Sequence, residues 1–114
     1  MPYTLEVCVD STASALAAMQ GGVHRLELCA DLVIGGTTPS LALLQQVKAE
    51  TGLTGAGLCC GPALGISATT AGSWPQMAQS AARLVEAGAD GIVTGVLDPG
   101  GGCGWWRPCS PSMP

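Results

Sequence analysis

The sequence predicts an α/β fold in which a parallel sheet is built from consecutive strand–helix units. The pattern Glu-x-Cys-x-Asp occurs twice, starting at Glu6 and again at Glu27. Each copy lies in a short apolar run and is followed by a helix-forming segment. A turn of Gly, small and polar residues leading into a strand also recurs, at 21–27 and 87–93. Alternating strands and helices with short connections favour right-handed βαβ units and a parallel sheet.

The first unit is the clearest. Residues 3–9 alternate between polar and apolar or β-branched side chains, which predicts a strand. Asp10 and Ser11 offer an N-cap for an Ala-rich helix over 11–20. The pair Gly21-Gly22 then predicts the end of that helix.

The second unit repeats this order. Residues 25–29 predict a strand, and a loop over 30–38 follows it. Pro39 suits the first turn of a helix, with Thr38 as its cap and the helix over 40–50.

The later part of the chain is less regular. Residues 54–73 contain no charged residue and are rich in Gly, Ala, Ser and Thr, so we expect an irregular third unit, with a strand stub at 58–60. A helix over 75–87 and a strand over 91–96 form the fourth unit. The domain is thus expected to span 3–98, and the Gly-, Trp- and Pro-rich tail 99–114 is expected to be disordered.

Composition excludes several classes of function. The chain has 114 residues, four Lys or Arg and a net charge of -4, which argues against nucleic acid and anionic membranes as partners. It contains no apolar run long enough for a membrane span, and its first residues do not resemble a signal peptide. We therefore expect a cytosolic protein that can enter the nucleus passively, with its six cysteines as thiols.

Two of these cysteines are candidate metal ligands. Cys8 and Cys29 occupy the same position in the two copies of the repeated pattern. If the strands pair so that the two copies lie in register, the two thiols lie side by side near the carboxyl ends of the strands. Two thiolates suit Cu(I), and zinc is the second candidate, although zinc requires about four ligands. His24 lies at the opposite end of its strand and is a poor co-ligand.

A structural interpretation of these residues stays open. Cysteine is among the most buried residue types and often packs as a small hydrophobe. Arg25 could neutralise one of the carboxylates of Glu6 and Glu27, which would otherwise be costly on an inward face.

The motifs together resemble the CutC family of copper homeostasis proteins. The similarity rests on the segments 5–11, 21–29, 35–40 and 88–97. It implies a TIM barrel, of which this chain holds about four β/α units, and an intracellular protein that forms homo-oligomers at full length. It also implies Cu(I) binding, with Cys8 and Cys29 as the positions that carry over.

The sequence departs from the family pattern in three ways. His24 stands where Asp is usual, and the Arg-Pro-Arg-x-Gly-Asp-Phe stretch after the third strand is absent. The chain also contains four of the eight units, which leaves open sheet edges and is expected to weaken folding. GC-rich codons for 60–69 would encode Arg-Pro-Arg-Ala-Gly-Asp-Phe if read two bases later, so we hypothesise a frame-shifted segment at 54–73 and a second one after Pro99.

Three functions are compatible with these features. The first is Cu(I) binding by a copper homeostasis protein. The second is a remnant of a TIM-barrel enzyme that acts on a small anionic metabolite, with Glu6 or Glu27 as general base. The third is a truncated isoform without activity. The sequence favours the first, without a catalytic role.

Overall fold

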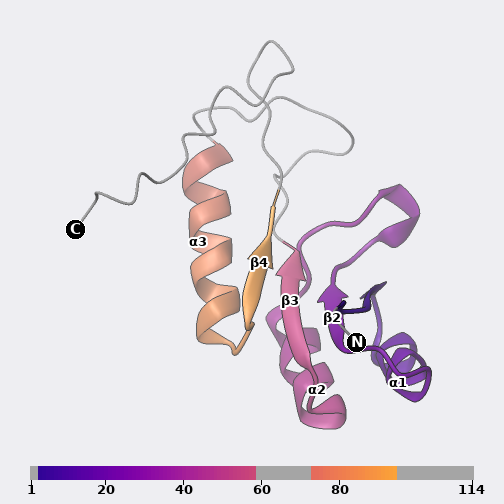
Figure 1. Ribbon diagram of the computed structural model, residues 1–114. Coiled ribbons are helices and arrows are strands. Elements are labelled where there is room, and N and C mark those ends of the chain that lie inside the picture. The colour runs from indigo at the N-terminus through magenta and orange to yellow at the C-terminus, as the bar shows by residue number, and fades with distance from the viewer. Residues whose placement is uncertain (1–2, 59–72, 95–114) are drawn as a thin grey trace.

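The computed structural model describes residues 3–58 and 73–94, and within them it shows an α/β arrangement (Figure 1). The elements in chain order are β1 (Glu6–Val9), α1 (Thr12–Gln20), β2 (Arg25–Leu28), the 3-10 turn η1 (Leu32–Ile34), α2 (Leu41–Thr51), β3 (Thr54–Leu58), α3 (Ser73–Glu86) and β4 (Gly91–Val93).

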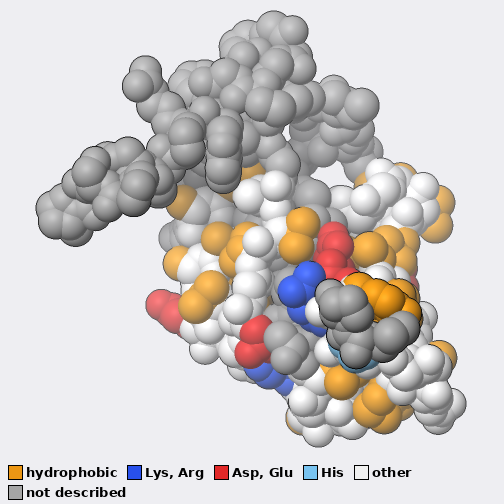
Figure 2. Space-filling view, in the orientation of Figure 1, with side chains coloured by type: hydrophobic (Ala, Val, Ile, Leu, Met, Phe, Trp, Pro, Cys, Tyr) orange, Lys and Arg blue, Asp and Glu red, His pale blue; other side chains and the backbone are white. Residues whose placement is uncertain are grey.

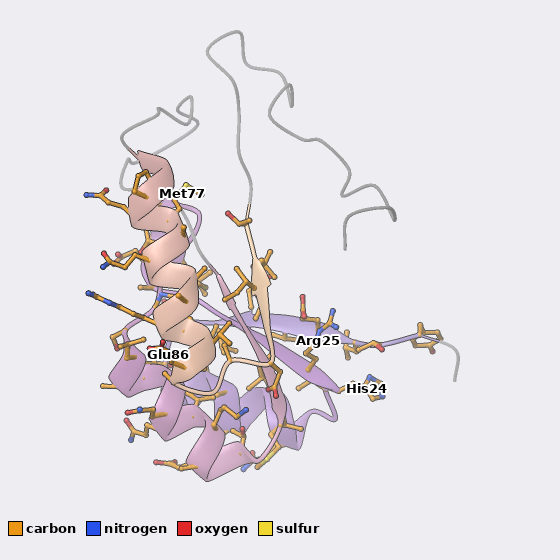
Figure 3. All side chains as sticks on the ribbon, turned by 90° about the vertical axis from the view of Figure 1, so that its left-hand side faces the viewer. His24, Arg25, Met77 and Glu86 are labelled. Carbon is orange, nitrogen blue, oxygen red and sulfur yellow. The ribbon has the colours of Figure 1, made fainter. Side chains whose placement is uncertain are left out.

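The four strands form one sheet in the order β1-β2-β3-β4, and each neighbouring pair is parallel. The three helices pack along the sheet, and Figure 3 shows them on one side of it. The predicted α/β class, with four consecutive strands in a parallel sheet, is therefore confirmed.

The core lies between the sheet and the helices. It consists of apolar side chains with at most 9% of their surface exposed: Val9, Ala15, Val23, Leu26, Leu28, Leu44, Val47, Met77, Leu84 and Ala89. Burying a leucine or valine contributes roughly 1.5–3 kcal/mol. Because this core takes residues from all three helices and from β1 and β2, it fixes which face of β1 and of β2 turns toward the helices.

Helix α1 begins and ends where the sequence predicts. The hydroxyl of Ser11 accepts a hydrogen bond from the amide of Ser14 at 3.1 Å, so Ser11 is the N-cap. The chain leaves the helix through Gly21 and then Gly22, whose φ of 84° lies in the left-handed region that glycine adopts without strain.

Helix α2 begins later than predicted. Its N-cap is Ser40, whose hydroxyl accepts from the Leu43 amide at 3.1 Å, so the expected cap at Thr38 is wrong. Pro39 is buried and precedes the cap instead of lying in the first turn. Gly52 ends the helix with φ 65°, and its amide donates to the Lys48 carbonyl.

The third unit contains a strand that the sequence did not predict at this position. The irregular segment was expected from residue 54 and a strand stub at 58–60, whereas β3 spans Thr54–Leu58. This strand pairs with β2 on one side and β4 on the other, so backbone hydrogen bonds compensate for its weak strand propensity. The rest of the predicted irregular segment and the predicted tail lie outside the described residues.

The fourth unit follows the prediction closely. Helix α3 begins two residues earlier than expected, at Ser73, and ends before Gly88, which has φ 106°. Strand β4 covers 91–93, and the predicted last residues of the strand, 95 and 96, lie outside the described part of the chain.

A lysine links the second and fourth units at the amino-terminal end of the sheet. The Lys48 ammonium in α2 donates to the carbonyl of Gly88 and lies 3.0 Å from a carboxylate oxygen of Asp90. A Cβ added to Gly88 would lie 3.5 Å from the Lys48 Cδ, so the aliphatic stem packs against this turn. The link therefore joins two segments that are far apart in the sequence.

Within residues 3–58 and 73–94, none of the helices combines the length and apolarity that a membrane span requires.

Candidate functional site

Strands β1 and β2 carry a polar face on the side of the sheet away from the helices. We define this polar face by Glu6, Cys8, Arg25 and Glu27. Side chains alternate along a strand, and the neighbouring positions on β1 and β2 pack into the core. Figure 3 shows Arg25 projecting away from the helices, and Figure 2 shows basic and acidic side chains next to one another on this side.

The register of β1 and β2 decides which of these side chains meet. Glu6 lies opposite Arg25 and Cys8 lies opposite Glu27. The two copies of the repeated pattern are therefore out of register, and the prediction that Cys8 and Cys29 lie side by side is wrong. A shift by two residues keeps the same side chains in the core, so the repeat could not distinguish the two registers.

Cys29 comes directly after β2, two residues beyond the partner of Cys8. With a rise of about 3.3 Å per residue and strands about 4.8 Å apart, the two cysteine Cα atoms are diagonal neighbours at about 8 Å. Cys29 is 1% exposed. Its amide donates to the Val9 carbonyl at 3.0 Å, and its thiol donates to the same oxygen at 3.5 Å. It therefore also extends the contact between the two strands.

Cys8 differs from Cys29 in its surroundings. It is exposed and carries a thiol in the reduced form. Partial desolvation raises the pKa of Cys8, and the charge and hydrogen bond of Glu27 and the charge of Glu6 raise this pKa further. The thiol is therefore protonated at neutral pH, and any reaction of its thiolate must first remove that proton.

The two carboxylates of the polar face have different partners. Arg25 forms an ion pair with Glu6, in which the side chains are 46% and 23% exposed. The arginine thus neutralises Glu6, one of the two carboxylates that it was expected to reach. Glu27 faces the Cys8 thiol instead, so the two predicted general bases are not equivalent.

His24 forms hydrogen bonds to the backbone of the residue just before β1. Its Nδ1 accepts a hydrogen bond from the Leu5 amide at 2.9 Å, and its own amide donates to the Leu5 carbonyl at 3.0 Å. This position at the start of β2, away from Cys29, agrees with the expectation that His24 is a poor co-ligand.

Residues 3–58 and 73–94, which the structure describes, hold no group of three or more His, Cys, Asp or Glu that could bind a metal ion. The four other cysteines, at 59, 60, 103 and 109, lie outside the described residues.

The contact between Cys8 and Glu27 was missed by reasoning from sequence. The alternation of side chains places both on one face, but the repeat aligned each glutamate with the other glutamate. The register of β1 and β2 pairs the Cys8 thiol with the Glu27 carboxylate. This register depends on backbone hydrogen bonds such as that from the Cys29 amide to the Val9 carbonyl.

Known proteins match this chain over most of its length. The sequence profile of the CutC family matches residues 3–105. A copper homeostasis protein cutC homolog of Mus musculus is 56% identical over 46 residues, which are 40% of this chain and 17% of the mouse protein. A family protein CutC of Xanthomonas campestris pv. campestris is 39% identical over 97 residues, which are 85% of this chain and 40% of that protein.

The fold matches as well. The crystal structure of a CutC protein from Streptococcus agalactiae superposes with a TM-score of 0.73 at 26% identity, covering 85% of this chain and 48% of that one. The chain thus spans less than half the length of these relatives. The profile match, which includes every element of the described sheet, shows that this chain belongs to the CutC family of copper homeostasis proteins.

Proposed function

We propose that this chain is an intracellular copper homeostasis protein that binds Cu(I) through the thiolates of Cys8 and Cys29. The observation that carries the proposal is membership in the CutC family, with two thiols at adjoining strands of one sheet. Relatives in mouse and human are named copper homeostasis proteins. We further propose that the four β/α units form part of a TIM barrel, which the parallel strand order supports.

The donor set fits Cu(I) better than other metal ions. Thiolates are soft ligands, and Cu(I) accepts fewer of them than zinc, which prefers four. To bind a metal ion together with Cys8, the Cys29 thiol must turn away from the Val9 carbonyl and toward Cys8. The Cys29 amide can keep its hydrogen bond to that carbonyl. Cys8 is exposed and needs only to lose its proton.

A competition titration tests this proposal. The chain is prepared with Ser at positions 59, 60, 103 and 109, so that only Cys8 and Cys29 remain, and is titrated anaerobically against a chromogenic Cu(I) chelator. We expect tight binding that is lost in Cys8→Ser, in Cys29→Ser and in the double variant. An unchanged affinity in the double variant would remove both residues from the proposal.

A second function, that of an enzyme on a small anionic metabolite, is favoured by one observation. Glu27 faces a thiol, whereas Glu6 is neutralised by Arg25, so Glu27 is the better candidate for a general base. This function predicts a turnover that Glu27→Gln abolishes and Cys8→Ser tolerates. Cu(I) binding predicts the opposite: Cys8→Ser abolishes the function and Glu27→Gln is tolerated.

A further inference from the structure

The side chain of His24 supplies a hydrogen-bond acceptor for the residue that precedes β1. Its Nδ1 accepts from the Leu5 amide at 2.9 Å. The Leu5 carbonyl in turn accepts from the amide of His24 at 3.0 Å and from the amide of Arg25 at 3.2 Å. Leu5 is therefore joined to the start of β2 by three hydrogen bonds, and one of them depends on a side chain that titrates.

The hydrogen bond from the Leu5 amide requires a neutral imidazole ring. A neutral ring carries its proton on one nitrogen and accepts at the other, whereas a protonated ring donates from both nitrogens. Because Nδ1 of His24 is the acceptor here, the proton of the neutral ring lies on Nε2. A second proton, taken up at Nδ1, would place two donors face to face, and the Leu5 amide would lose its acceptor.

The position of His24 allows solvent to deliver that proton. The side chain is exposed, and Figure 3 shows it at the end of β2, away from the helices. His24 is also the single histidine of the chain. Histidine is the side chain that ordinarily changes charge between about pH 5 and pH 8. A transition in this range that disappears when His24 is replaced can therefore be assigned to this ring.

The charged groups on the neighbouring elements are paired with one another. Glu6 on β1 forms an ion pair with Arg25 on β2, and Lys48 forms one with Asp90 before β4. Helix α1, which packs against β1, has no titratable side chain, and strand β3 has none either. The other titratable side chains of β1, β2 and the segment before β1 are Tyr3, Cys8 and Glu27. Within residues 3–58 and 73–94, no carboxylate pairs with His24, so a protonated ring has no ion pair there to replace the lost hydrogen bond.

The equivalent position of the fourth unit carries an acceptor of a different kind. Asp90 directly precedes β4, as His24 directly precedes β2. The carboxylate of Asp90 accepts a hydrogen bond from Lys48 at 3.0 Å. A carboxylate accepts in its charged form and keeps this ability in mild acid, whereas a histidine ring loses it on protonation. Of these two positions, the one before β2 therefore carries the acceptor that is sensitive to pH.

We propose that His24 forms a pH-sensitive contact that controls the start of β1. The neutral ring holds Leu5 against β2 at the upper end of the histidine range. Protonation releases the Leu5 amide as the pH falls, because the hydrogen-bonded state binds one proton fewer than the released state. Glu6 and Arg25 directly follow the two linked residues, so the release also loosens the ion pair of the polar face. This contact does not depend on the proposed binding of copper.

Scalar coupling across the hydrogen bond gives the first test. The metal-free, isotope-labelled 114-residue chain is studied by NMR at about pH 8 and about pH 5. We expect a coupling between the Leu5 amide nitrogen and Nδ1 of His24 at the higher pH, and its loss at the lower pH with the midpoint at which the ring titrates. A coupling that is absent at the higher pH, or that persists at the lower pH, overturns the proposal.

Amide hydrogen exchange in a matched pair of variants gives the second test. His24→Asn keeps a side-chain oxygen that can accept from the Leu5 amide but does not titrate, and His24→Ala has no acceptor. In the unsubstituted chain, we expect protection of the Arg25 amide, corrected for the intrinsic exchange rate, to fall about fivefold on acidification, as for the loss of one ordinary hydrogen bond. The Val7 amide, further along β1, should keep its protection.

The two variants separate the ring from other effects of pH. The Arg25 amide should stay protected at both pH values in His24→Asn and should be poorly protected at both in His24→Ala. The same loss on acidification in His24→Asn overturns the proposal, and so does an equal loss at Val7, which would mean that the whole sheet opens. If a variant does not fold, the coupling in the unsubstituted chain decides. Copper is absent from both tests, so a failure of the copper proposal does not change their outcome.

Discussion

The thiol of Cys8 lies against the carboxylate of Glu27 on the neighbouring strand, and Cys29 lies two residues further along. The Cys8 thiol is therefore a protonated group that is hydrogen-bonded to Glu27. Copper binding at Cys8 would therefore release a proton, and its apparent affinity should rise with pH until the thiol is ionised.

Replacing Glu27 by Gln should increase the reactivity of Cys8. The amide removes a negative charge that raises the pKa of the thiol, so the thiolate fraction at a given neutral pH increases. We expect several-fold faster alkylation of Cys8 by iodoacetamide, measured by peptide mapping at pH 7.5. Glu50→Gln on α2 is the control and should leave the rate unchanged. An equal rate in the Glu27 variant would mean that the carboxylate does not influence the thiol.

Replacing Lys48 by Met should destabilise the fold by about 1 kcal/mol. The variant keeps an aliphatic stem but loses the hydrogen bonds to the Gly88 carbonyl and the Asp90 carboxylate. The loss is modest because the ion pair is about one-third exposed. Urea denaturation at one protein concentration measures it. Gln45→Met, at an exposed position of the same helix, is the control. Equal effects of the two substitutions would mean that the hydrogen bonds of Lys48 to Gly88 and Asp90 do not stabilise the fold.

Replacing Ser40 by Ala should cost about 1 kcal/mol of stability, because the amide at the start of α2 loses its acceptor. Ser40→Asp should restore most of that stability, since aspartate also accepts a hydrogen bond from this amide. Circular dichroism during thermal unfolding measures both variants. If Ser40→Asp is as unstable as Ser40→Ala, the cap lies elsewhere.

Replacing Gly52 by Ala should destabilise the end of α2 by about 1–2 kcal/mol, because a Cβ is unfavourable in the left-handed conformation. Space is not the cause, since an added Cβ would meet no atom within 4 Å. Gly52→Asn should cost less, because asparagine tolerates this conformation. The difference in urea midpoints checks the ranking, and a greater loss with Asn than with Ala would contradict it.

Much of the fold could be predicted from local patterns. The caps and glycines of α1, the glycine that ends α3 and the parallel order of strands all follow from residue types at fixed positions. The N-cap of α2 was predicted two residues too early because Thr38 and Ser40 are both good caps and flank Pro39. Only the hydrogen bond from Leu43 to Ser40 distinguishes the two.

The site was predictable only in part. Strand parity places Cys8 and Glu27 on one face, and the structure agrees. The register was not predictable, because the predicted and the observed pairing of β1 with β2 bury the same Leu26 and Leu28. Strand β3 was missed because its Gly- and Ala-rich sequence has little preference for a strand and is held by its two neighbours.

The spacing of the strand pairs has a consequence for how the chain folds. The segment that joins paired positions is shorter between β1 and β2, as from Glu6 to Arg25, than between β3 and β4, as from Ala56 to Gly91. Chain closure over the longer segment costs roughly 0.5 kcal/mol more entropy. We expect the β1-α1-β2 unit to form first, so Leu26→Ala should slow refolding while Leu84→Ala in α3 chiefly speeds unfolding. The last unit of the sheet would then be the first to open in the native protein.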